Sequence, residues 1–142
     1  MSAIKYPFPT FLVDTSVLAR RELPAVEAAL AVLKAGAELC TCALLIAEVS
    51  YSARDAKEYR LLRGLMDGMI FLSSDDACDQ KALAAQERLA AVRRHRTSIV
   101  DLFVTAIAAA HGATVLHYDS DFERIGEVIG ANTQWVVPRG TL

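Results

Sequence analysis

Short apolar segments alternate with helix-like segments along the whole chain, and this alternation restricts the possible folds more than any other feature. The apolar segments are short enough to be strands, and the segments between them have apolar residues at helical spacing. Parallel strands joined through helices form sheets that are covered on both faces. The sequence therefore predicts an α/β fold with a mostly parallel central sheet, whose strands we place at residues 10–14, 38–41, 69–72, 114–118 and 133–137.

Helix boundaries follow from capping residues and breakers. Pro24 opens the first long helix, which is closed by Gly36. Thr41 is the expected N-cap of the next helix. We place the helices at 24–36, 42–53, 55–66, 77–93, 98–111 and 121–128, and the absence of repeats or a Pro/Gly/Ser-rich linker predicts a single domain over residues 1–142.

Composition excludes several classes of protein. The chain is 54% apolar and 23% charged, which is typical of a globular protein and not of a disordered one. Its net charge of −2 argues against a uniformly basic nucleic-acid binder but allows a local basic patch. Three cysteines without C-x-x-C spacing are expected to be buried thiols in a reducing compartment. The N-terminus has no apolar stretch and no segment is long enough to span a bilayer, so we expect a cytoplasmic protein without membrane contact.

Acidic residues follow two of the predicted strands. The segment "VLHYDSDFERI" ends a strand and is followed by Asp119 and Asp121, and "FLVDTS" places Asp14 after the first strand. Asp14 taken alone is equally well explained as a helix N-cap. In open α/β sheets, however, ligands bind at the carboxyl ends of the strands, so these acids are candidates for one shared site.

Two further acids lie in apolar helical surroundings. Glu48 has mainly apolar or uncharged neighbours one turn away, and no lysine or arginine of its own helix is placed to pair with it. A glutamate at the edge of a helix, reaching water, is the alternative. Asp101 lies in a helix that is apolar almost all round, on one stripe with Ser98 and Thr105. Because an isolated buried carboxylate is costly, both acids are expected to have a charged partner.

A divalent cation would be such a partner. Converging carboxylates remain ionised around Mg²⁺ or Mn²⁺, which prefer oxygen ligands, and no His/Cys set with zinc spacing competes. An acidic pocket that holds Mg²⁺ or Mn²⁺ is suited to phosphodiester hydrolysis by a metal-activated water.

At these residues the chain resembles the PIN-domain ribonucleases, and most closely the VapC toxins of toxin–antitoxin modules. The segments that carry the resemblance are "LVDTSVL", "AEV", "VDLFVTAIAAAHGATVLHYDSDFERI" and "WVVPRG". It implies a three-layer α/β/α fold and a metal-dependent endoribonuclease that cleaves structured RNA such as tRNA or rRNA. It also implies a homodimer inhibited by a VapB-type antitoxin in a hetero-oligomer.

Residue by residue, the resemblance assigns the core acids to Asp14, Glu48, Asp101 and Asp119 as catalytic and metal-binding residues. Asp121 is an auxiliary metal ligand or the cap of the next helix, and Ser16 matches a hydroxyl that helps to hold the site. Thr105, on the polar stripe of Asp101, is a second supporting residue.

The basic segment before the acidic helix and the activity of the domain each allow two interpretations. Arg93, Arg94, His95 and Arg96 precede the acidic helix; the arginines either bind RNA phosphates or form a solvated helix end that its dipole favours. The alternative to the nuclease is a non-catalytic PIN domain that only binds RNA or a protein, although such a domain has little reason to keep four carboxylates that repel one another.

Overall fold

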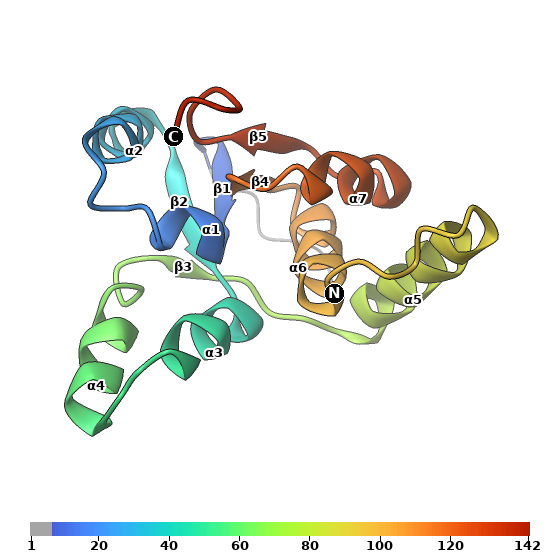
Figure 1. The fold of residues 1–142 in the computed structure, drawn as a ribbon, viewed down its shortest axis with the longest axis horizontal. Helices are drawn as coiled ribbons and strands as arrows, with labels where there is room; N and C mark the ends of the chain where they lie inside the picture. Colours follow the sequence, from blue (N-terminus) through green and yellow to red (C-terminus); the bar gives the residue numbers. More distant parts are fainter. Residues whose placement is uncertain (1–6) are drawn as a thin grey trace.

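The computed structural model describes residues 7–142, and its centre is a sheet of five parallel strands in the order β3-β2-β1-β4-β5 (Figure 1). The expectation for the extreme N-terminus concerns, in part, residues 1–6, which lie outside the described range. The strands are β1 (Thr10–Val13), β2 (Glu38–Thr41), β3 (Ile70–Phe71), β4 (Thr114–His117) and β5 (Thr133–Trp135). This arrangement confirms the predicted α/β fold with a parallel sheet.

Helices lie between and around the strands, at positions close to those predicted. They are α1 (Thr15–Leu18), α2 (Pro24–Gly36), α3 (Ala43–Tyr51), α4 (Ala56–Gly64), α5 (Asp76–Ala91), α6 (Ile99–Ala110) and α7 (Asp121–Ile129). Within the described range, no helix is both long and apolar enough to cross a bilayer.

Alternate residues of the central strand belong to different hydrophobic clusters, which shows that helices cover both faces of the sheet. Leu12 packs in one cluster with Val104 and Ile107 of α6. Its neighbours Phe11 and Val13 pack in another, which includes residues of α1 and α2. Because side chains of a strand point to opposite faces in turn, the apolar run of β1 fills both layers.

One predicted helix cap is wrong. Thr41 does not cap α3, because it is the last residue of β2, where its buried hydroxyl contacts the sulfur of Met66 at 3.7 Å. Cys42 occupies the N-cap position without a side-chain hydrogen bond. The predicted start of α2 at Pro24 is confirmed. In the structure Asp75 caps α5 by accepting a hydrogen bond from Cys78 N at 2.9 Å.

The end of α5 differs from the prediction, since the helix stops at Ala91 and Arg93 adopts φ = 58°. Arg94 N then donates to Leu89 O at 2.7 Å, as in the left-handed turns that commonly end helices. Glycine usually occupies this position, because a Cβ in the left-handed region costs roughly 1–2 kcal/mol. An arginine here is therefore locally unfavourable.

Gly126 provides a test of how tightly α7 packs on the start of β5. A Cβ at this position would lie 2.6 Å from Thr133 Cγ2 and 3.1 Å from the carbonyl oxygen of Ala131. We expect Gly126→Ala to lower the free energy of unfolding by about 1–2 kcal/mol, since overpacking outweighs the gain in helix propensity. Gly36→Ala, which meets nothing within 4 Å, should raise it by about 0.5 kcal/mol.

Urea denaturation measures both changes, and Gly126→Ala combined with Thr133→Ser should recover part of the loss because the clashing methyl is gone. Equal stabilisation by both glycine substitutions would contradict the close approach of α7 to β5.

Candidate active site

The acidic residues lie at the carboxyl edge of the sheet, where the strand order reverses. From β1 the chain proceeds outward to β2 and β3, and then returns to β4 on the other side of β1. Val13 and Leu116 are paired in register, and Asp14 N donates to Leu116 O at 2.9 Å. Asp14 and Asp119 therefore follow adjacent strands at the switch point, where ligands of such folds bind.

Asp14 has one carboxylate oxygen used locally and one without a partner. Its side chain is only 4% exposed, and Oδ2 accepts a hydrogen bond from Ser16 N at 2.9 Å, which caps α1. Oδ1 is buried and has no hydrogen-bond partner within residues 7–142. Burial raises the pKa of Asp14 and the charge of Glu48 adds to the rise, while the hydrogen bonds from Ser16 oppose it. The capping role and a ligand role are thus compatible.

The surroundings of Asp101 indicate that the acidic residues lie close together. It lies in the first turn of α6, is 8% exposed, and its backbone N–H donates to Ser98 Oγ at 3.2 Å. Burial raises the pKa of Asp101 from 3.8 to about 7, with further contributions from the charges of three other acids, Asp14, Asp119 and Glu48. The structure therefore brings together four acids from four segments of the chain.

Glu48 is less buried than the sequence suggested. Its side chain is half-buried on α3 and accepts a hydrogen bond from the hydroxyl of Thr15. Thr15 thus positions this carboxylate at the site, a role that the sequence analysis did not assign. The only signal in the sequence was a hydroxyl next to Asp14.

The two acids that follow β4, Asp119 and Asp121, have different roles. Asp119 Oδ1 accepts a hydrogen bond from Asp121 N at 3.0 Å, and Asp121 is the first residue of α7. The proposal that Asp121 caps this helix is wrong, because the carboxylate that satisfies the first turn belongs to Asp119. Asp121 is also not among the acids that chiefly raise the pKa of Asp101.

Hydroxyls join the strand ends. Ser16 Oγ accepts a hydrogen bond from Tyr118 N at 2.9 Å and so links the turn after β1 to the turn after β4. Thr105 is fully buried, and its hydroxyl donates at 2.7 Å to the backbone oxygen of Asp101 instead of its carboxylate. Ser16 lies within the site, whereas Thr105 supports the helix that carries Asp101.

His117 is a second residue that the sequence analysis missed. It is fully buried beneath the site, with its ring 5.0 Å from Phe122 and 4.9 Å from Trp135. Nδ1 accepts the backbone N–H of Asp119 at 3.2 Å. Burial lowers the pKa of His117 despite the nearby charge of Asp119. A neutral ring thus orients the Asp119 backbone; its position at the end of β4 was the only signal.

The acidic side chains are of the type that binds divalent cations, but they are not placed as a complete coordination shell. Among the described residues, no three His, Cys, Asp or Glu side chains are placed to hold a metal ion together, and no salt bridge involves the converging acids. Their donors are all carboxylate oxygens, as Mg²⁺ and Mn²⁺ prefer, and the buried, unpartnered Oδ1 of Asp14 is available to such an ion. The residues therefore fit a hard divalent cation.

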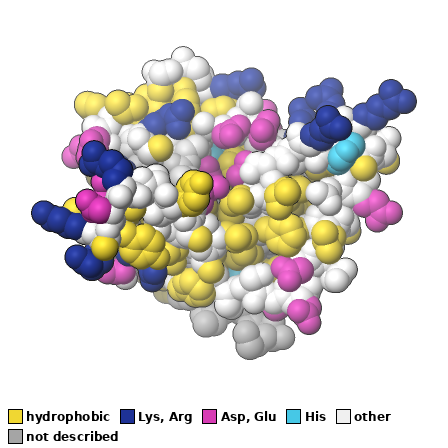
Figure 2. Space-filling model, turned by 60° about the horizontal axis from the view of Figure 1, so that its bottom comes forward, with side chains coloured by type: hydrophobic (Ala, Val, Ile, Leu, Met, Phe, Trp, Pro, Cys, Tyr) yellow, Lys and Arg dark blue, Asp and Glu magenta, His cyan; other side chains and the backbone are white. Residues whose placement is uncertain are grey.

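The predicted basic residues lie outside this cluster. Arg93, Arg94 and Arg96 are exposed in the loop between α5 and α6, at the right of Figure 1. Figure 2 shows acidic side chains gathered near the middle of one face, and a separate group of Lys or Arg side chains with a histidine at its right edge.

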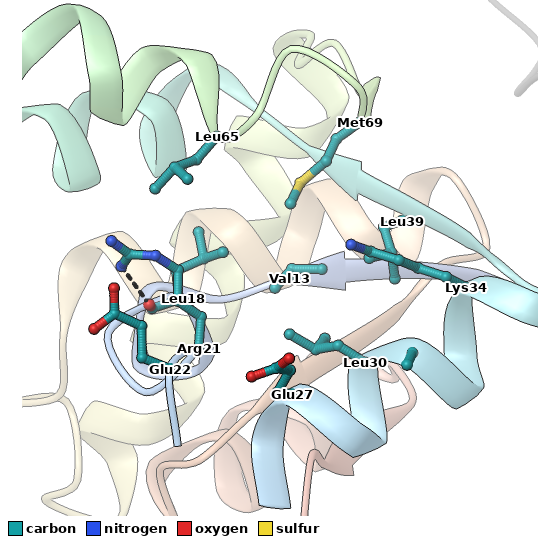
Figure 3. Close-up of a pocket in the computed structure, with 11 residues that line it drawn as sticks. Val13, Leu18, Arg21, Glu22, Glu27, Leu30, Lys34, Leu39, Leu65 and Met69 are labelled. Atoms are coloured by element: carbon teal, nitrogen blue, oxygen red, sulfur yellow. Dashed lines mark hydrogen bonds between the residues drawn. The ribbon is translucent and has the colours of Figure 1, made fainter. Parts of the chain in front are cut away.

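A cavity of about 430 Å³ lies elsewhere, between α2, the turn after α4 and the sheet (Figure 3). Its lining is mainly apolar, with Arg21, Glu22, Glu27 and Lys34 as the charged members. Arg21 donates to Leu18 O at 2.8 Å, and none of the five predicted acids lines the cavity. It is not the site of the acidic chemistry.

Comparison with known proteins identifies the family. Residues 11–128 match the PIN domain model. The chain is 36% identical to ribonuclease VapC51 of Mycobacterium tuberculosis over 132 residues, which cover 93% of this chain and 96% of that protein. It is 35% identical to ribonuclease VapC21 of the same organism over 133 residues, 92% and 96% of the two chains.

The fold agrees with this assignment. VapBC-1 of nontypeable Haemophilus influenzae superposes with a TM-score of 0.75 at 13% identity, over 89% of this chain and 98% of that chain. The chain therefore belongs to the PIN-domain family and, within it, to the VapC ribonucleases, the toxins of VapBC toxin–antitoxin modules.

Proposed function

We propose that this protein is an Mg²⁺- or Mn²⁺-dependent endoribonuclease that cleaves structured RNA, tRNA or rRNA, as the toxin of a VapBC-type module. The observation that carries the proposal is the convergence of Asp14, Glu48, Asp101 and Asp119 without a cationic side chain paired to them in the described part of the chain. Helix capping explains one oxygen each of Asp14 and Asp119, but the gathering of four repelling carboxylates is best explained by a bound cation.

Each side chain has a distinct task in this proposal. Asp14 Oδ1 and Asp101 are the most buried oxygen donors and hold the cation, with Glu48 and Asp119 completing the acidic wall. Thr15 holds the carboxylate of Glu48, and Ser16 keeps the two strand ends together. We assign Asp121 to the outer part of the site as an auxiliary acid.

The bound cation would lower the pKa of an attacking water and stabilise the charge that develops on the phosphate. The water oxygen forms the new bond to phosphorus, the bond from phosphorus to a ribose oxygen breaks, and a proton from the water reaches the leaving ribose oxygen through the solvent. The acidic side chains determine where the phosphate can sit, because they repel it everywhere except next to the cation.

We also propose the partners that the family resemblance implies. These are a cognate VapB-type antitoxin, a second copy of the chain in a homodimer, and a toxin–antitoxin hetero-oligomer in the cytoplasm. In support, the solved structure from H. influenzae is a VapBC structure. Residues 1–142 form a single PIN domain in this proposal, of which the family model covers residues 11–128. Co-purification with the product of a small adjacent reading frame tests the antitoxin.

Cleavage of a bulk tRNA and rRNA pool tests the activity. Wild-type protein should produce discrete cuts with Mg²⁺ or Mn²⁺ and none with EDTA. Asp14→Asn and Asp101→Asn should lose about 100-fold or more of the rate, because each removes a charge from the cation site. Asp79→Asn is the control, since Asp79 is exposed on α5, outside the acidic cluster.

Equal cutting by wild type and both site variants would mean a contaminating nuclease. Metal-independent RNA binding without any cut, in protein shown to be free of antitoxin, would favour the non-catalytic alternative.

The pKa of Asp101 predicts how stability depends on pH without metal. Because this pKa is raised to about 7, the folded protein binds more protons than the unfolded chain between pH 4 and 7. The free energy of unfolding should therefore fall as pH rises through this window, by up to roughly 4 kcal/mol for a rise of about three pKa units. Thermal unfolding in EDTA measures it.

Asp101→Asn should reduce this pH dependence and melt above wild type at pH 8 in EDTA, because it removes the buried charge. Adding Mg²⁺ at pH 8 should raise the melting temperature of wild type and not that of Asp101→Asn. The same pH dependence of the melting temperature in the wild type and in Asp101→Asn between pH 4 and 8 would contradict the raised pKa of Asp101.

A further inference from the structure

The loop between α5 and α6 contains a concentrated group of arginines that is separate from the acidic site. Residues 93–96, here called the basic loop, are Arg93, Arg94, His95 and Arg96, and all four are exposed. No salt bridge found among residues 7–142 includes any of them. These arginines are therefore not paired with the acids that lie beyond them along the chain, and their guanidinium groups are available to an external anion.

The local structure does not account for these residues. The dipole effect falls off within the last turn of a helix, and in α5 that turn contains Arg88, whereas residues 93–96 lie beyond the end of the helix at Ala91. Arg93 moreover occupies the left-handed position at φ = 58°, where glycine is the favoured residue. A residue kept in a conformation that disfavours its side chain points to a role for that side chain.

The basic loop is held at both ends. Leu89 and Leu102 are buried in one cluster between α5, α6 and α7, and Arg94 N is bonded to Leu89 O. At the other end Ser98 caps α6 through the N–H of Asp101. The loop thus leads directly into the helix that carries an acid of the proposed cation site, and Arg96 is within about 17 Å of Asp101 along the chain.

We propose that the basic loop binds phosphates of the RNA that flank the one being cleaved. This rests on the proposed function, since it names the protein surface that holds the substrate of the acidic site. Four carboxylates repel a polyanion, and at physiological ionic strength charges act over only about 8 Å, so a distant uniform charge would not offset that repulsion. Guanidinium groups in direct contact with phosphate oxygens do, and they position the strand without reading its sequence.

Binding to a fluorescent tRNA pool tests the proposal, with Asp14→Asn in EDTA as the parent protein so that no cleavage occurs. Arg94→Ala/Arg96→Ala in this parent should raise the Kd about tenfold or more. It should also reduce the slope of log Kd against log salt concentration by about 1.5 to 2. The matched control is Arg60→Ala/Arg63→Ala, which removes the same charge from exposed positions on α4 at the other side of the molecule (Figure 1).

The Arg93→Gly variant distinguishes a loss of RNA binding from a loss of stability. Glycine fits the left-handed position better, so this variant should melt about 3 °C higher than its parent. It also lacks the guanidinium group, so it should bind the tRNA pool several-fold more weakly. A more stable protein that binds RNA less well cannot be explained by damage to the fold.

The proposal is overturned if the Kd and the salt dependence of Arg94→Ala/Arg96→Ala equal those of the parent, or if the α4 control loses as much affinity. The latter result would show an effect of net charge alone. A loop that binds only an acidic partner protein would also leave RNA binding unchanged. Failure of the proposed function is a separate outcome, since it appears as absence of metal-dependent cleavage by wild type, whatever the binding results.

Discussion

The site depends on one electrostatic constraint, which is that four carboxylates share a partly buried volume without a cationic side chain paired to them in the described residues. Such a group can respond by taking up a proton, by binding donors, or by binding a cation. The structure shows the first two: the pKa of Asp101 is raised to about 7, and Asp14, Glu48 and Asp119 each accept a hydrogen bond. The third is what the proposed activity requires.

The fold itself provides donors at the place where the acids lie. In a parallel α/β unit the helix that follows a strand begins at the carboxyl edge of the sheet, so its free N–H groups point to that edge. Asp14 caps α1 and Asp119 accepts the first N–H of α7, both directly after strands, and Asp101 lies in the first turn of α6, which follows α5 and leads back into β4. Helix N-termini are partially positive, and those of α6 and α7 therefore offset part of the repulsion. The same topology that gathers the acids thus makes their ionisation less costly.

Much of the fold was predictable from the sequence, because the strands are short apolar runs and a helix start such as that of α2 is marked by Pro24. The acids after β1 and β4 could be placed at one edge from topology alone. The residues that were missed depend on contacts between distant segments. Thr15 donates a hydrogen bond to Glu48, 33 residues away in the sequence. The burial of His117 depends on side chains that pack over it, which its own strand does not reveal. Thr41 was assigned to a cap because a strand end and a helix start have the same local residues.

Two places break the local rules of stability, and both adjoin the start of α6. Asp101 puts a charge into an otherwise apolar helix, and Arg93 puts a Cβ into a left-handed turn one loop earlier. Natural sequences are generally consistent between local preference and fold, and their violations concentrate at functional sites. In the proposed function, an acid and a base that are each unfavourable where they stand would be stabilised by a bound metal ion and by RNA phosphates, respectively. Under the two proposals made above, the start of α6 is the place where cation binding and substrate binding meet.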